Sequence, residues 1–487
     1  MSAENLTLFD EFELKGFWRL PRSSDQQSWG SVSFSRDSGI TLELLGNIAG
    51  YQELSQLMAL GDLSEPIIQG FTANGKNVTL QDCYVTSGQY HFPGIPIQKF
   101  AASCLFVGDI AFQSEQDIRF ASLLVNLTCL EDWVSISPFN VDRACITPSG
   151  RGVSATYAPA PIITVSIPTL DSELQLVGQF EMRADRRREL RWFYSQYFRI
   201  IPSELQPWEW FLDVIVGLSD LLTVFMWQPI YARRVIGLGS EDQEMRRDGR
   251  TAPRRDSTEV FWNFLTPQTE PELSEGNILF RFGSIQEDIP SLLENWFSRR
   301  RDLEPVVDLF LGSLYAGKAH DAFQFLAMTR VLEGLHRATI GGQYHSDSDY
   351  DSYRAVLCEQ VNLLAADNDW KQKFINGEIR WGNQYSQRRR YRDLLRTMDA
   401  NLRSLLIQDV DGFVNRIVDT RNYLTHVDEG SRANALHGAD LTLAFWKLQI
   451  LAGVLLLREA GLSDDQIFRT LSNNSNIMLR LNQARHI

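Results

Sequence analysis

The chain has 487 residues and a mass of 55.7 kDa, a length that predicts two or three domains, each with its own core. A composition of 44% hydrophobic and 22% charged residues excludes a mostly disordered or fibrous protein. With 47 basic against 61 acidic residues the net charge is −14, which excludes a function that depends on a global positive field. Any nucleic-acid site must therefore be a local patch.

The N-terminus lacks a basic segment followed by an apolar one, so no secretory signal is expected. The two most apolar stretches, residues 211–226 and 441–457, are short and interrupted by charged or polar residues, which favours buried helices over membrane spans. A cytoplasmic protein without membrane contact is expected.

Residues 12–179 are dominated by short runs with strand chemistry, punctuated by Gly, Pro, Asn and Asp. Apolar and polar residues alternate in 30–34 and 40–44, as expected for antiparallel strands with one face in a core. This pattern predicts a β-rich domain, either a sandwich or an open barrel.

A helix is predicted after Pro207, because apolar residues recur there at helical spacing. Residues 227–238 again have strand-like composition, whereas residues 239–257 are polar and basic and are predicted to form a loop. This middle section is taken to complete an N-terminal domain of residues 1–290. Its only histidine is His91, so a regulatory or sensor role is expected for it rather than catalysis.

After Pro290 the strand signal disappears, and residues 291–487 are predicted to form an all-α bundle. The predicted class is thus α+β multidomain. Helix ends are marked by Gly341-Gly342, Gly461 and Ser463, which favour C-terminal and N-terminal caps. The predicted helices cover residues 291–299, 303–315, 319–338, 353–366, 385–406, 410–425, 434–459 and 463–471.

Several motifs resemble cofactor or metal sites but are incomplete. Residues 312–319 resemble the sequence of a phosphate-binding loop. A predicted helix precedes them, however, and Ala319 has no side-chain oxygen to hold Mg²⁺. His320-Asp321 and Glu333 with His336 are each only half of a metal site. No metal and no cofactor are expected.

Arginine and histidine together can cleave RNA without a metal. The 2′-hydroxyl attacks the adjacent phosphate, histidine transfers protons, and arginine stabilises charge on the phosphorane-like transition state. Three pairs have the required spacing: Arg330 with His336, Arg421 with His426, and Arg432 with His437.

Context favours Arg421 and His426. They follow an amphipathic segment and precede Gly430, which places them at a helix C-terminus. The negative helix end favours a protonated histidine, and the long Arg421 side chain can reach back although its position is rotated by roughly 140°. Asn422 shares a face with His426.

Residues 413–426, FVNRIVDTRNYLTH, resemble the signature of HEPN domains, whose ribonuclease members carry arginine, a polar residue and then histidine. FLAMTRVLEGLHR at 325–337 and RRRYRDLL at 388–395 resemble helices of the ApeA-like HEPN branch. FELKGFWRLP and GSVSFSRDSGITLELLG are similar to the β-rich N-terminal domain that accompanies this branch in ApeA, a single-protein anti-phage system.

The resemblance implies a homodimeric helical bundle with a composite cleft, and metal-independent RNA cleavage that halts growth of the infected host. It implies that Arg421 and His426 are catalytic and that Asn422 supports them. We further expect Glu333 to orient Arg421, although an exposed or capping role is an open alternative.

A basic cluster with one aromatic residue, Arg388, Arg389, Arg390, Tyr391 and Arg392, is expected to guide RNA. Tyr391 is expected to stack on an unpaired base, which makes RNA with exposed loops, tRNA included, the expected substrate. A phage-derived activator is the expected signal.

Two other functions remain open. One is a non-catalytic HEPN scaffold that binds RNA or protein. The other is a β-domain ligand sensor whose helical half serves only for dimerisation.

Overall fold

The computed structural model describes residues 6–23, 25–48, 64–89, 94–143, 146–147, 150–185, 188–245, 251–263, 267, 269–317, 319–427 and 429–487. His91 and Lys318 lie outside these ranges. The chain divides into two compact units. The β-rich unit comprises residues 1–223, 229–274 and 280–290, and the helical unit comprises residues 224–228, 275–279 and 291–487. The predicted class, a β-rich region followed by a helical one, is confirmed.

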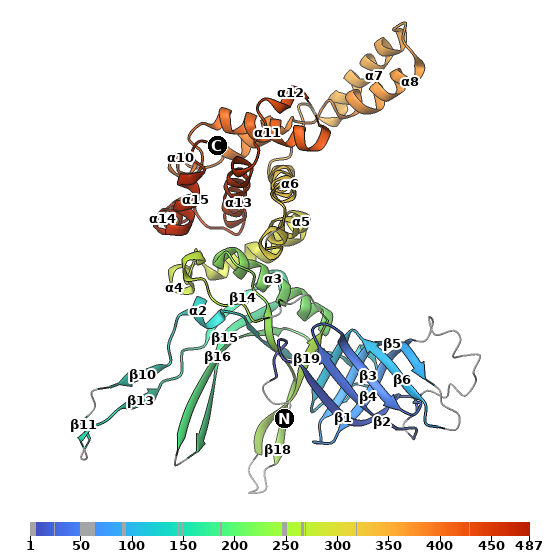
Figure 1. The fold of residues 1–487 in the computed structure, drawn as a ribbon, viewed down its shortest axis with the longest axis vertical. Coiled ribbons are helices and arrows are strands. Elements are labelled where there is room, and N and C mark those ends of the chain that lie inside the picture. Colours follow the sequence, from blue (N-terminus) through green and yellow to red (C-terminus); the bar gives the residue numbers. More distant parts are fainter. Residues whose placement is uncertain are drawn as a thin grey trace. The chain divides into compact units, whose positions relative to one another are not determined.

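Six antiparallel strands of the β-rich unit close into a barrel, because β5 pairs with both β4 and β6 (Figure 1). The predicted barrel is therefore closed rather than open. Trp18 is fully buried and lies against Gly70, where an added Cβ would come within 2.5 Å of the indole ring. The barrel strands are β1 (Phe12–Arg19), β2 (Ser28–Ser35), β3 (Gly39–Leu45), β4 (Ser64–Thr72), β5 (Asn77–Gln89) and β6 (Ile97–Ala102).

Beyond β5 the same sheet continues in the order β7, β19, β18, β9, β16, β15, β14. These strands are β7 (Cys104–Gly108), β9 (Ser122–Leu127), β14 (Ile163–Ile167), β15 (Ser172–Asp185), β16 (Glu189–Pro202), β18 (Ala232–Met245) and β19 (Thr251–Trp262). Three small pairs complete the unit: β8 (Arg119–Phe120) with β17 (Gln206–Pro207), β10 (Phe139–Asp142) with β13 (Ser154–Tyr157), and β11 (Ile146–Thr147) with β12 (Gly150–Arg151).

The prediction of a loop at residues 239–257 is wrong. Strands β18 and β19 run through most of this segment and pair across a register shift. Cross-strand ion pairs such as Arg255 with Glu241 line the exposed hairpin. A solvent-exposed hairpin needs no apolar alternation, so its polar composition suggested a loop.

The predicted helix after Pro207 is α3 (Trp208–Met226), and its first turns lie on the sheet. The Trp208 ring centroid is 5.2 Å from that of Trp262 and 6.3 Å from that of Phe106. Phe211 packs edge-on against Phe120. This aromatic cluster is the core between α3 and the strands. The unit also contains the short helices α2 (Leu130–Val134) and α4 (Phe282–Ile285).

The helical unit is built around α13 (Ala439–Glu459), which packs against α6. Among the described residues α13 is the one helix long and apolar enough to cross a membrane, and 78% of its most apolar stretch is buried inside the protein, as in a core helix. The other helices are α5 (Ile289–Tyr315), α6 (Asp321–Thr339), α7 (Asp347–Leu363), α8 (Asn368–Phe374), α9 (Gln387–Arg396), α10 (Ala400–Leu406), α11 (Val410–His426), α12 (Glu429–Arg432), α14 (Asp464–Asn473) and α15 (Ser475–Gln483).

The predicted helix ends are confirmed where cap residues marked them. Gly341 and Gly342 follow α6 with φ of 92° and 132°, and Gly461 follows α13 with φ of 109°. Ser463 forms a capping box with Gln466 at the start of α14. Residues 312–315 form the last turn of α5, and residues 316, 317, 319 and 320 lie between α5 and α6.

Some helix boundaries differ from prediction. The helices predicted at 291–299 and 303–315 are one helix, α5, which continues through Pro305. The helix predicted at 385–406 is two, because Asp399 caps a new helix, α10. Helices α7 and α8 extend together away from the other helices of this unit (Figure 1).

Candidate functional site

Helix α11 carries the predicted arginine and histidine in its last turns. Asp409 caps its start by accepting a hydrogen bond from the Gly412 amide at 3.0 Å. Phe413, Val414, Ile417 and Val418 are buried, and the helix packs against α9 and α6. The apolar periodicity therefore places the polar segment 421–426 where the core ends.

Arg421 reaches back to His426, as its length allows. Its Nη1 lies 3.3 Å from Nε2 of His426 and donates to Oδ1 of Asn422 at 3.1 Å. Because a guanidinium can only donate, this contact is a hydrogen bond when Nε2 of His426 carries no proton. Arg421 and Asn422 are half-buried, whereas His426 is exposed. The three side chains form one polar group open to solvent.

The chain turns abruptly after His426. Val427 adopts the left-handed conformation with φ of 53°, and its amide donates to the Tyr423 carbonyl at 2.9 Å. A β-branched residue in this region is strained, at a cost of about 1–3 kcal/mol. Such strain is common at functional sites, and here it ends α11 immediately after the histidine.

The segment after α12 forms hydrogen bonds and ring contacts with α11, which the sequence did not indicate. Nδ2 of Asn434 donates to Asp419 at 3.2 Å, and the Leu436 amide donates to the Thr420 hydroxyl at 2.9 Å. The ring of His437 packs edge-on against Tyr423, with centroids 5.4 Å apart. Arg432, which the sequence paired with His437, forms an ion pair with Glu429 of its own helix.

In the remaining predicted pair, Arg330 lies on the surface and His336 lies in the core. Arg330 contacts Glu333 on the surface of α6, at 3.4 Å. His336 is fully buried, and its Nδ1 accepts from Nη1 of Arg390 at 3.0 Å. Burial and the nearby charge of Arg390 lower the pKa of His336. His336 therefore has a structural environment.

Glu333 does not contact Arg421 among the described interactions. Its carboxylate binds Arg337 at 3.0 Å and Arg330 at 3.4 Å. Glu333 thus forms ion pairs within α6, and its orienting role stays a prediction.

The predicted RNA-guiding cluster wraps around α9 instead of lining one face. Arg390 and Tyr391 are buried, with exposed fractions of 1% and 2%, so Tyr391 cannot stack on a base and this part of the prediction is wrong. The Tyr391 hydroxyl donates to the Thr329 carbonyl at 3.0 Å, and burial raises its pKa. Consecutive positions on a helix face different directions, so a run of arginines does not make a patch.

The remaining arginines of the cluster have partners within the unit. Arg388 forms an ion pair with Asp419, and Arg392 forms one with Asp411 at 2.7 Å. Arg389 lies over the Tyr385 ring at 3.7 Å. These contacts tie α9 to α11 and to the segment before α9.

Arg390 joins three parts of the unit. Besides His336, it donates to the carbonyls of Gly341 and Gly342 at 2.9 and 3.2 Å, and to the Tyr385 carbonyl at 3.1 Å. Its charge is thus held by neutral acceptors that link the end of α6 to the start of α9. A Cβ at Gly342 would lie 2.4 Å from the guanidinium, so glycine is required there.

No group of three His, Cys, Asp or Glu side chains suitable for a metal is present in the described ranges.

Comparison of the chain with known protein families agrees with its division into a β-rich and a helical part. Residues 13–296 match the family model ApeA N-terminal domain 1, and residues 326–466 match the model Apea-like HEPN. The second match includes most of α6 and all of α9 and α11, and with them Arg421 and His426. No curated protein and no solved structure matches the chain.

The environment of His336 predicts acid-sensitive stability. The pKa of His336 is lowered in the folded state, so the unfolded chain binds more protons. Stability therefore falls as the pH drops below about 6.5, the pKa of a histidine in the unfolded chain. Asp393, whose Oδ2 lies 3.7 Å from Nε2 of His336, offsets only part of this lowering of the pKa. Thermal unfolding of the full chain between pH 8 and pH 5 should show a larger loss of melting temperature for the parent than for His336→Gln, which keeps an acceptor for Arg390. Equal pH profiles would contradict the prediction.

Proposed function

The chain belongs to the ApeA family, in which a β-rich domain is joined to an HEPN domain, and from this premise we propose that it is an endoribonuclease that cleaves RNA at Arg421 and His426. ApeA is an anti-phage defence protein and HEPN domains are generally ribonuclease-like. The observation that carries the proposal is the 3.3 Å contact between Arg421 and His426 at the solvent-exposed end of α11. Cleavage would stop growth of the infected host.

The proposed reaction needs only groups that this chain contains. His426 accepts the proton of the RNA 2′-hydroxyl through Nε2 while the 2′-oxygen bonds to the adjacent phosphorus. Arg421 turns its guanidinium from His426 to the phosphate oxygens and stabilises their charge in the transition state. The bond from phosphorus to the 5′-oxygen breaks, that oxygen takes up a proton, and a 2′,3′-cyclic phosphate remains. Before RNA binds, Asn422 holds Arg421 beside His426 by accepting a hydrogen bond from Nη1.

One protomer offers only one such histidine. The proton that goes to the leaving 5′-oxygen needs a general acid, and a second copy of the chain would supply it. We therefore propose a homodimer through the helical half, a substrate with exposed single-stranded loops, tRNA among them, and a β-rich half, residues 1–290, that responds to a phage-derived activator.

Replacing His426 or Arg421 with alanine should reduce RNA cleavage by on the order of a hundredfold or more, since proton transfer and charge stabilisation are each typically worth that much. Both side chains lie at the solvent-exposed helix end, so the melting temperature should be nearly unchanged. Cleavage of a labelled RNA by purified full-length variants measures the effect. Arg432→Ala is the matched control, because the Arg432 side chain is exposed and forms an ion pair with Glu429 of its own helix. A folded His426→Ala variant that cleaves like the parent would overturn the assignment.

Cleavage should persist in EDTA, because arginine supplies the positive charge that a metal would otherwise provide. The same RNA assay, run with and without EDTA, measures this. Activity that disappears in EDTA and returns with Mg²⁺ or Mn²⁺, while the melting temperature stays constant, would refute the proposed chemistry.

Cleavage should also depend on dimerisation. Specific activity per protomer should fall when the protein is diluted below the dimer dissociation constant measured by sedimentation. A species that sediments as a monomer and is fully active would exclude the second histidine as the acid.

A further inference from the structure

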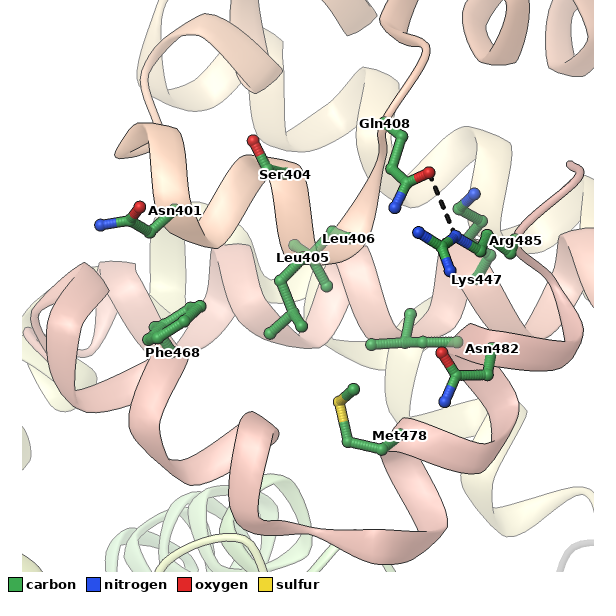
Figure 2. Close-up of a pocket in the computed structure, with 11 residues that line it drawn as sticks. Asn401, Ser404, Leu405, Leu406, Gln408, Lys447, Phe468, Met478, Asn482 and Arg485 are labelled. Carbon is green, nitrogen blue, oxygen red and sulfur yellow. Dashed lines mark hydrogen bonds between the residues drawn. The ribbon is translucent and has the colours of Figure 1, made fainter.

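A pocket of about 370 Å³ lies within the helical unit, between α10, α13, α14 and α15 (Figure 2). Its volume is at the lower end of the range of small-molecule sites, about 300–1,000 Å³. The lining residues are Asn401, Ser404, Leu405, Leu406, Gln408, Lys447, Phe468, Met478, Leu481, Asn482 and Arg485.

The lining is divided into a cationic end and an apolar part. Figure 2 shows Gln408, Lys447 and Arg485 gathered at one end, with Leu405 and Phe468 toward the other. Nε of Arg485 donates to Oε1 of Gln408 at 3.2 Å. None of the eleven lining residues is acidic. Two of the lining residues, Lys447 and Arg485, are therefore basic, and no lining carboxylate balances them.

Lys447 is the unusual member of this set, because only 4% of it is exposed. Its Nζ donates to the Ala484 carbonyl at 3.2 Å and lies 5.3 Å from the centre of the Phe413 ring. Burial and the nearby charge of Arg416 lower the pKa of Lys447 to about 8. Within the described ranges no carboxylate forms an ion pair with this ammonium, although buried charges are normally paired.

We propose that this pocket binds a small organic anion, whose phosphate or carboxylate group lies against Lys447 and Arg485 and whose apolar or planar body lies against Leu405 and Phe468. The anion supplies the countercharge that Lys447 lacks, and the apolar lining selects a molecule larger than an inorganic ion. Polar side chains at the rim, Asn401, Ser404 and Asn482, offer hydrogen bonds to the body of the ligand.

Occupancy of this pocket also bears on α11. Phe413 and Arg416, the neighbours of Lys447, belong to the helix that carries Arg421 and His426. A bound anion neutralises charge beside that helix and so is suited to regulate the site. This regulatory step rests on the proposed ribonuclease function, whereas binding itself does not, and the experiment measures binding without RNA.

Three probes separate the contributions of charge and body. AMP carries both a phosphate and a planar body, inorganic phosphate carries only the charge, and adenosine carries only the body. Calorimetric titration and thermal shift of the full-length protein should show AMP binding at least tenfold more tightly than inorganic phosphate or adenosine. Lys447→Met should weaken AMP binding at least tenfold, since a hydrogen bond to a charged group is lost.

Controls distinguish this pocket from other anion sites and from misfolding. Lys447→Met should keep or raise the melting temperature without ligand, because an unpaired buried charge is removed. Arg485→Gln, at an exposed position, should also weaken AMP binding, and Lys373→Met, whose side chain is 77% exposed, should bind like the parent. The proposal is overturned if neither AMP nor phosphate binds, or if folded Lys447→Met and Arg485→Gln bind AMP as the parent does.

Discussion

The buried face of α11 determines where the candidate site lies. Phe413, Val414, Ile417 and Val418 hold the helix against α9 and α6, and Arg421 continues that face one turn beyond Ile417, where the apolar contacts stop. The guanidinium is therefore half-buried and rests on neutral and polar neighbours, while the strained Val427 ends the helix directly after His426. Packing thus places one cation and one imidazole together at a solvent-exposed edge, where the proposed cleavage would use them.

A second constraint fixes α6 and α9, the two helices that support α11, relative to each other. Buried Arg390 donates to no carboxylate among the described contacts. It donates instead to His336 and to the carbonyls that follow α6 and precede α9. Removing one partner of such a network leaves a buried charge or carbonyl unsatisfied, which is costly. Two of the arginines that looked suited to RNA, Arg388 and Arg390, thus contribute to the helical scaffold, through Asp419 and His336 respectively.

Sequence patterns correctly predicted the features that depend on residues close together in the chain. Alternation predicted strands of the barrel, and the cap residues Gly461 and Ser463 marked helix ends correctly, because these preferences act over a few residues. Patterns failed where partners distant in sequence decide. Tyr391 is buried because Thr329 and the neighbouring helices enclose it. The β18–β19 hairpin extends from strands that are held in the sheet by β9 and β7, which are distant in sequence. The pocket beside Lys447 was not foreseen, since four helices are needed to form it.

The chemistry of the RNA ends produced by the purified protein tests the central claim most directly. Attack by the 2′-hydroxyl, with Arg421 and His426 as the reacting groups, predicts a 2′,3′-cyclic phosphate on one fragment and a free 5′-hydroxyl on the other. Fragments with a 3′-hydroxyl and a 5′-phosphate would mean that water attacked the phosphate and that a different mechanism operates. Mass spectrometry of the fragments distinguishes the two results.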